Sequence, residues 1–300
     1  MLVIKIMNKR TGGTLELTHQ ESRWQCLYPK GLSPTSAQIN VSSIVGGHGS
    51  LYRSSRLTDR QIVLTLAVHG DVEKNLMDLY DVMATDEEIR FYYRTKRTNV
   101  YIDGWIDNIS ADRDQNPVYA QFTINCPQPF FRSMNEIIND WAIREDFFEF
   151  LSEDGKVGYI QIDQEYNGTS YEGGLEISTM RFNKNAVINN NGQASIGMIV
   201  EVECLDDVES YTIRNVMDET RFFGLKYEFK QNDKFYINTN FGEEEVYLIR
   251  NGETINLINY IEPNSSWLQL KSGDNILTYD GVGSDATSVK VHYSIVYKGV

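Results

Sequence analysis

The residues that could support metal or hydrolytic chemistry lie far apart and lack the spacing that such chemistry needs. The histidines are His19, His48, His69 and His292. No two of them stand four residues apart and none lies next to a cysteine, so the sequence contains no zinc-binding motif. The glycines around His48 do not match the sharp turn that carries a hydrolase nucleophile. We interpret each histidine as a surface residue.

The acidic residues do not define a site either. Asp112, Asp114 and Asn116 have the spacing of the first three calcium ligands of a helix–loop–helix site. However, Pro117 stands where that loop needs glycine, and Thr123 stands where it needs a bidentate glutamate. Glycosidases use two carboxylates at a set distance, and the surroundings of no acidic pair here single it out. The sequence therefore predicts no catalytic residue, no cofactor and no metal site.

Two tryptophans of the second half, Trp141 and Trp267, are candidates for a platform on which sugars stack. Aromatic side chains on strands belong to a hydrophobic core more often than to such a platform. Nothing in their spacing separates the two cases. We retain Trp267 as a weak candidate for glycan stacking, with core packing as the alternative.

Length and charge point to two domains of different character. A chain of 300 residues exceeds what one hydrophobic core usually organises. The net charge is −14, yet residues 1–132 hold 15 Lys and Arg against 14 Asp and Glu, a net of +1, which leaves −15 for residues 133–300. An acidic domain is a poor candidate for binding nucleic acid or an anionic membrane. We expect no nucleic-acid partner.

The cysteines and the apolar runs indicate a soluble protein made in the cytoplasm. Cys26, Cys126 and Cys204 are widely separated and odd in number, so no disulfide framework is expected. Cys126 and Cys204 fall on the apolar face of alternating strands, which favours buried thiols. The first ten residues lack the features of a signal peptide, and no apolar run reaches membrane-spanning length.

The stretch from Val118 to Arg132 divides the chain. Residues 118–126 alternate apolar and polar side chains, which predicts a strand with one buried face, and Pro127 and Pro129 then end it. Before it, the pattern gives strands and one helix, from Asp71 to about Ala84, with Asp71 as its cap. The sequence predicts an N-terminal β-sandwich with one helix over residues 1–132 and a second domain over 133–300.

One segment of the first domain, Thr35–Arg60, has no obvious core to join. Its two arms favour strands, and the glycine-rich run Gly46–Gly49 lies between them. Ile39, Val41 and Ile44 stand almost alone among Ser, Asn and Gln. We interpret the segment in one of two ways: as a long hairpin, polar on both faces, that binds a partner, or as an exposed loop.

The second domain reads almost entirely as strands. Residues 198–204, 223–229 and 289–297 alternate apolar and polar side chains, and the pair Asn251-Gly252 is a strong signal for a two-residue hairpin turn. A short helix is expected near Met134–Trp141. Many short strands with regular turns predict a sandwich or jelly roll.

Three stretches together resemble the distal tail proteins of tailed bacteriophages that infect Gram-positive hosts, also found in prophages. They are the glycine-centred arm Thr35–Arg60 with the strand and helix that follow, the run QFTINCPQPFFRS, and the C-terminal series KFYINTN, WLQLKSGDNILTYDG and VKVHYSIVYKGV. Residues 142–195 match the family pattern least. The resemblance implies that the second domain is a galectin-like or carbohydrate-module-like β-sandwich.

The resemblance also implies a structural role without catalysis. Such proteins form a hexameric ring, in which a hairpin belt of about residues 35–60 embraces the neighbouring subunit, at the distal end of the virion tail. The implied partners are further copies of this chain, the tail tube protein, a tail-associated hub or lysin protein, and a receptor-binding protein or cell-surface glycan. An adhesin that binds carbohydrate through the second domain is the alternative. The residues implied for self-assembly are Ile39, Val41, Ile44, Gly46, Gly47, Tyr52, Arg53 and Arg56.

Overall fold

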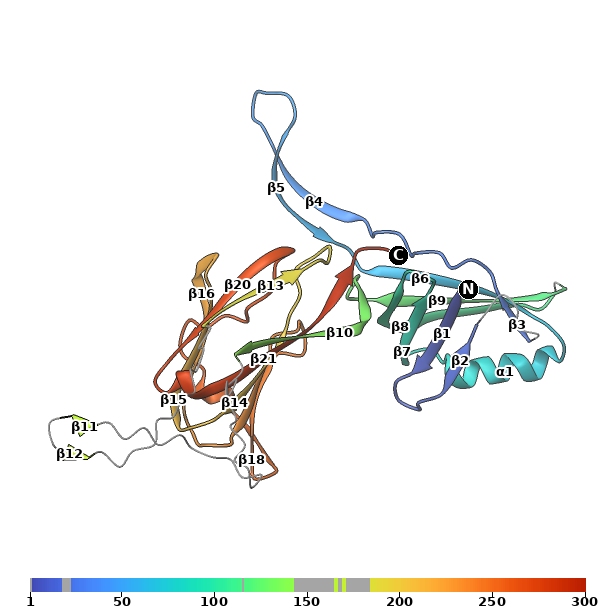
Figure 1. Ribbon diagram of the computed structural model, residues 1–300. Helices are drawn as coiled ribbons and strands as arrows, with labels where there is room; N and C mark the ends of the chain where they lie inside the picture. The colour runs from blue at the N-terminus through green and yellow to red at the C-terminus, as the bar shows by residue number, and fades with distance from the viewer. Residues whose placement is uncertain (1, 18–22, 115, 143–164, 167–168, 171–183) are drawn as a thin grey trace, which may run out of the picture. The chain divides into compact units, whose positions relative to one another are not determined.

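The computed structural model describes residues 2–17, 23–114, 116–142, 165–166, 169–170 and 184–300. The fold is mainly β, as the alternating patterns predict, with antiparallel pairing throughout the described strands (Figure 1). The chain forms two compact units. The first unit consists of Met1–Ile137, Asn190–Ile196 and Ser294–Val300, and the second of Ile138–Asn189 and Gly197–Tyr293.

The first unit is a sheet whose strands run in the order β3-β6-β9-β8-β7-β1-β2. Their bounds are β1 Val3–Asn8, β2 Thr14–Glu16, β3 Trp24–Cys26, β6 Arg60–Val68, β7 Glu88–Arg94, β8 Asn99–Asp112 and β9 Val118–Cys126. Alternate side chains of these strands are buried, as period-two patterning requires. The predicted strand over residues 118–126 is confirmed.

The one helix among the described residues of the first unit, α1 Val72–Val82, lies where the apolar stripe predicts it. Its cap is Asp71, whose carboxylate accepts a hydrogen bond from the backbone N–H of Lys74 at 3.3 Å. Leu76 and Leu79 are buried in the core that the strands build. The expectation of strands with one packed helix is therefore confirmed.

Strand β8 bridges two parts of the sheet. Its first half pairs with β7 and its second half with β9, with a bulge between Ile106 and Asn108. Gly104 lies near this change of partner. A Cβ atom there would come within 2.8 Å of backbone and side-chain atoms of Ile124, Asn125 and Cys126. Only glycine allows the two strands to approach so closely.

The described residues of the second unit form two main sheets. One runs β19-β18-β17-β14-β21 and the other β13-β20-β15-β16. Their bounds are β13 Asn185–Asn190, β14 Ile199–Cys204, β15 Val208–Asn215, β16 Asp218–Phe229, β17 Lys234–Asn238, β18 Glu245–Arg250, β19 Glu253–Asn256, β20 Gly273–Asp280 and β21 Thr287–Tyr297. Two 3₁₀ turns, Ile258–Tyr260 and Ser284–Ala286, and the short pair β11 Glu165–Tyr166 and β12 Thr169–Ser170 complete the described elements.

Aromatic side chains join the two sheets of the second unit. The ring of Phe235 on β17 stacks on Phe229 of β16 at 4.3 Å between centroids and meets the edge of Tyr211 on β15 at 5.3 Å. All three side chains are fully buried. The predicted hairpin turn is also present, because Asn251 and Gly252 both have positive φ and join β18 to β19.

One expected element is wrong. Residues 134–141 are not a short helix but part of strand β10, Phe131–Ala142, whose first residues pair with Tyr101 and Val100 of β8. The run has a helix-like spacing of apolar residues. However, it follows Pro129 in an extended passage, and β10 pairs with both β8 and β21. Tertiary pairing overrides the local pattern here. His19 and most of the stretch 142–195 lie outside the described residues.

Candidate functional site

The segment 35–60 is a hairpin, β4 Ala37–Ser43 and β5 Ser50–Leu57, that forms a two-stranded sheet of its own (Figure 1). The two strands pair with each other along their whole length, from Ala37 opposite Leu57 to Ser43 opposite Ser50. Every residue of both strands is exposed or partly exposed. Of the two interpretations left open above, the hairpin is therefore the correct one.

The hairpin has one apolar face, which corrects the expectation that both faces are polar. A bulge beside Val41 shifts the register so that Val41 lies opposite Tyr52 rather than Arg53. Ile39, Val41 and Tyr52 thereby come to one face, with exposed fractions of 59%, 56% and 64%. The bond of 2.9 Å between the hydroxyl groups of Tyr52 and Ser55 lies on the same face.

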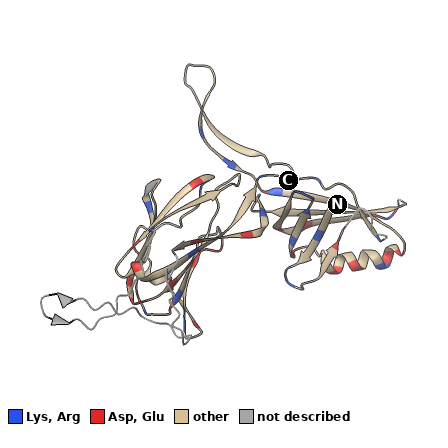
Figure 2. Ribbon diagram, viewed as in Figure 1, with Lys and Arg blue, Asp and Glu red and all other residues tan. Residues whose placement is uncertain are grey.

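The opposite face is polar, and its side chains bond to each other across the strands. Arg56 Nε donates to Gln38 Oε1 at 2.9 Å, and Arg53 Nε donates to Ser42 Oγ at 3.0 Å. Asn40 Nδ2 donates to Ser54 Oγ at 3.0 Å. These cross-strand bonds fix the pairing register without any buried core. The two strands contain arginines and no acidic residue, so their ribbon in Figure 2 has blue segments and no red one.

All the residues expected to serve self-assembly therefore lie on this hairpin, but in three different places. Ile39, Val41 and Tyr52 lie on the apolar face, and Arg53 and Arg56 lie on the polar face. Ile44, Gly46 and Gly47 form the tip, where Gly46 has a φ of +74°. Ile44 is 40% exposed, and its carbonyl accepts a bond from Gly47 N–H at 3.3 Å.

The base of the hairpin is held by Arg60, a residue that the sequence did not single out. Arg60 is the first residue of β6 and is only 1% exposed. Its guanidinium donates to the backbone carbonyls of Pro129 at 2.8 Å and Ser33 at 2.7 Å, and also to those of Gly31 and Lys298. It lies 4.5 Å from the centre of the Phe131 ring.

Arg60 is an unusual buried cation. Among the described residues no carboxylate forms an ion pair with it. Backbone carbonyls and the face of the Phe131 ring compensate its charge, and burial lowers its pKa. The carbonyls belong to the segment entering the hairpin, to the passage after β9 and to residue 298. Arg60 thus ties the hairpin base to the core. The signal in the sequence, one arginine at the start of an apolar strand, is too common to have revealed this role.

The segment that leads into the hairpin also packs very closely against neighbouring backbone. Gly31 has a φ of +88°, and a Cβ there would lie 1.9 Å from the carbonyl oxygen of Gln61. A Cβ at Gly299 would lie 2.6 Å from the ring of Pro34. The N–H of Val300 donates to the carbonyl of Leu32 at 3.0 Å. The segment that leads into the hairpin is therefore clamped on both sides.

The described residues offer little for catalysis. Cys26, Cys126 and Cys204 are free thiols, and burial raises the pKa of each to about 12, which keeps them protonated. No group of three His, Cys, Asp or Glu in the described part of the chain is placed to hold a metal ion. No described helix is long and apolar enough to cross a membrane.

The two tryptophans considered for sugar stacking differ in their surroundings. Trp141 is buried, and its indole N–H donates to the carbonyl of Lys184 at 3.2 Å, so its ring serves the core. Trp267 is partly exposed and packs on Phe223, with 4.9 Å between ring centres. One side of the Trp267 ring is thus engaged in packing.

Comparisons with known proteins point to phage tails. Residues 191–297 match the family described as siphovirus-type tail component, C-terminal domain. This stretch contains most of the second unit and the C-terminal series of motifs quoted above. The resemblance to phage distal tail proteins is thereby confirmed. A comparison with curated protein sequences gives no match.

Solved structures extend the similarity to the whole chain. The Dit protein of phage SPP1, described as a paradigm of the hub adsorption apparatus in phages infecting Gram-positive bacteria, matches with a TM-score of 0.67 and 13% identity over 98% of this chain and 99% of that chain. A chain of the phage P2 baseplate in its activated conformation matches with a TM-score of 0.53 and 14% identity, over 99% and 98%. This chain has the fold of those baseplate components.

Proposed function

We propose that this protein is a structural hub of a phage tail tip, a ring that joins the tail tube to the host-recognition apparatus. The observation that carries the proposal is the hairpin β4–β5: a long ribbon with an apolar face that no other described part of the chain covers. An isolated two-stranded ribbon is at best marginally stable in water. A neighbouring subunit that covers the apolar face would supply the missing burial.

The ring is proposed to be hexameric, with the hairpin of each copy laid on the next. A contact between two different surfaces of identical subunits is heterologous, and it yields a closed ring when the rotation between neighbours closes. In this arrangement residues 1–132 form the ring, and residues 133–300 form a galectin-like sandwich that carries the excess negative charge. The proposed partners are the tail tube protein, a tail-associated hub or lysin protein and a receptor-binding protein, at the distal end of the virion tail. The protein would be made in the cytoplasm of the bacterial host, and its role would not be enzymatic.

The first test is the mass of the purified protein in solution, with negative-stain images of the same sample. We expect rings for the wild type, and folded monomers for a variant in which the tip Gly46–Ser50 is deleted and both arms are shortened. A matched control replaces the tip alone with Asn-Gly and keeps both arms and their apolar face. Rings formed by the shortened variant would refute the role of the hairpin.

The alternative function is a carbohydrate-binding adhesin that acts through the second domain. It is compatible with a hub role, because a ring component can also carry a binding module. Trp267, proposed from the sequence as a stacking residue, is partly exposed. Binding of a glycan that is lost in Trp267→Ala would support this candidate.

A further inference from the structure

The second unit has an open hollow at a place where its strand pairing is irregular. Val208 of β15 lies opposite Phe229 of β16, but Ser210 lies opposite Lys226. One residue of β15, Glu209, therefore faces two residues of β16, Tyr227 and Glu228. Such a bulge re-aims side chains that regular alternation would turn inward.

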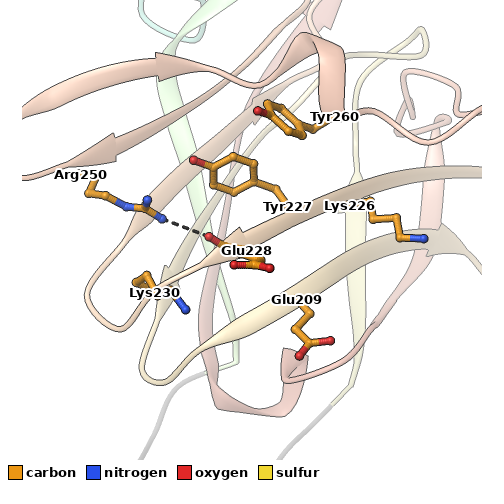
Figure 3. Close-up of a pocket in the computed structure, with 7 residues that line it drawn as sticks. All are labelled: Glu209, Lys226, Tyr227, Glu228, Lys230, Arg250 and Tyr260. Atoms are coloured by element: carbon orange, nitrogen blue, oxygen red, sulfur yellow. Dashed lines mark hydrogen bonds between the residues drawn. The ribbon is translucent and has the colours of Figure 1, made fainter.

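All three residues of the bulge line the hollow, which has a volume of about 620 Å³. The other lining residues are Lys226, Lys230, Arg250 and Tyr260. They come from β16 and the turn after it, from the end of β18 and from the 3₁₀ turn Ile258–Tyr260 (Figure 3). Bulges are over-represented beside binding sites, and this one has shaped a surface recess.

An ion pair between Arg250, which lines the hollow, and the buried Asp233 fixes the geometry of the hollow. Arg250 donates through Nε and one terminal nitrogen to both carboxylate oxygens of Asp233, at 2.9 and 2.6 Å, and Asp233 is buried. The same terminal nitrogen of Arg250 donates to the carbonyl of Glu228 at 3.1 Å, which fixes the bulge (Figure 3). A bidentate pair on a buried carboxylate gives the side chain one orientation.

Two tyrosines form the aromatic wall. The rings of Tyr227 and Tyr260 meet edge to face with 4.7 Å between their centres, and Tyr260 is 44% exposed. Figure 3 shows their hydroxyl oxygens on the same side of the pair. Such a wall offers an apolar ring surface and polar tips at once.

The lining chemistry selects a class of ligand. An apolar small molecule needs an enclosed, mostly apolar pocket, whereas charged side chains of both signs line this open hollow. Carboxylates only accept hydrogen bonds and ammonium or guanidinium groups only donate them, so together they suit a ligand whose groups do both. Hydroxyl groups have that property. A sugar ring adds C–H faces that pack on tyrosine.

We propose that the hollow around Tyr227 and Tyr260 binds a neutral saccharide. The exposed face of Tyr260 stacks on a sugar ring, while Lys226 and the Glu209 and Glu228 carboxylates bond its hydroxyl groups. The net charge of −15 over residues 133–300 disfavours a polyanionic chain. The proposal deepens the adhesin candidate, moves its site away from Trp267, and does not depend on ring formation.

The test measures binding of cellotetraose, maltotetraose, chitotetraose and a rhamnose tetrasaccharide to the full chain by calorimetry, with a glycerol-phosphate polymer as the anionic probe. We expect one or more of the neutral sugars to bind at millimolar concentration. Tyr260→Ala should weaken that binding by about tenfold, and Lys226→Ala by a smaller factor. Tyr247→Ala, which removes a ring of the Tyr236–Tyr247 stack on the other sheet, is the matched control and should bind normally.

Several outcomes would overturn the proposal: no neutral sugar binds, the glycerol-phosphate polymer alone binds, or Tyr260→Ala binds as well as the wild type. Loss of binding in Trp267→Ala with retention in Tyr260→Ala would also overturn it. Melting curves of the variants establish that each is folded. The variant with the shortened hairpin should bind sugar normally, so failure of the ring and failure of the saccharide site are distinguished.

Discussion

The hairpin β4–β5 and the strand pair β6–β9 belong to the same unit and are both antiparallel ladders, of seven and nine paired positions. In β6–β9, Ile62, Leu64 and Leu66 are completely buried on one face. In β4–β5, the corresponding apolar residues are more than half exposed. Similar backbone pairing thus coexists with opposite burial of the apolar side chains.

This difference shows that backbone pairing sets the shape of a ribbon while burial decides its stability. A fully buried aliphatic side chain contributes about 1.5–3 kcal/mol, and β6 has several. The hairpin has none, so within one chain it relies on cross-strand polar bonds, each worth about 1 kcal/mol or less, and on its base. Its apolar face then remains available for another surface.

The strongest test of this contrast compares two arginines, Arg60 at the buried base of the hairpin and Arg56 on its exposed arm. Arg60→Met leaves four backbone carbonyls without their donor in a buried place, so we expect a loss of about 3–4 kcal/mol in the free energy of unfolding. Arg56→Met on the exposed hairpin should change it by less than about 0.5 kcal/mol. Chemical denaturation followed by circular dichroism measures both. Similar losses in the two variants would contradict the distinction between the base and the arms.

A smaller effect, dependent on pH, is expected in the second unit. Burial alone would raise the pKa of Asp233, but the hydrogen bonds from Arg250 and from the Lys230 N–H outweigh it and lower the pKa. The stabilisation is then present above the usual aspartate range, about pH 4, and is lost as pH falls through the lowered pKa. Asp233→Asn should cost about 1–3 kcal/mol at pH 7 and progressively less below pH 4.

The control for this titration is Asp59→Asn, an exposed acid at the base of the hairpin. Its free energy of unfolding at pH 7 should lie within about 0.5 kcal/mol of the wild-type value, because the side chain is exposed. The hairpin strands themselves contain no carboxylate, so acid should affect the core of the second unit before it affects the ribbon. A loss in Asp233→Asn that stays constant from neutral pH to pH 3 would show that the ion pair is not its source.

Local patterning accounts for the parts of the fold that could be predicted. The strand over residues 118–126, the helix capped by Asp71 and the Asn251-Gly252 turn all depend on nearby residues, so the sequence indicates them directly. The sequence of 35–60 left a hairpin and an exposed loop both open, because its mostly polar arms fit either one.

The remaining features depend on contacts between distant residues. The run 134–141 is a strand because β10 pairs with β21 as well as with β8, and its own sequence encodes neither partner. Arg60 gains its role from carbonyls at residues 31, 33, 129 and 298. The apolar face of the hairpin arises from a bulge, and the Tyr227 hollow from another. A bulge shifts the alternation of side chains by one residue. A prediction that assumes strict alternation therefore assigns the residues beyond the bulge to the wrong face.

The smallest effect on stability should accompany the largest effect on assembly. Ile39→Ser combined with Val41→Ser removes the apolar face of β4, where both side chains are already more than half exposed. We expect the free energy of unfolding of the monomer to change by less than about 0.5 kcal/mol. In the proposed ring, the hairpin is held by burial of that face on a neighbouring subunit, so we expect the rings to dissociate. The mass in solution at one fixed protein concentration measures the shift from rings to monomers.

The matched control, Asn40→Ala with Ser54→Ala, alters the polar face of the same ribbon and should leave the rings intact. If both double variants dissociate to the same extent, the two faces are equivalent and the apolar face is not the contact; if neither does, the ring is held by another surface.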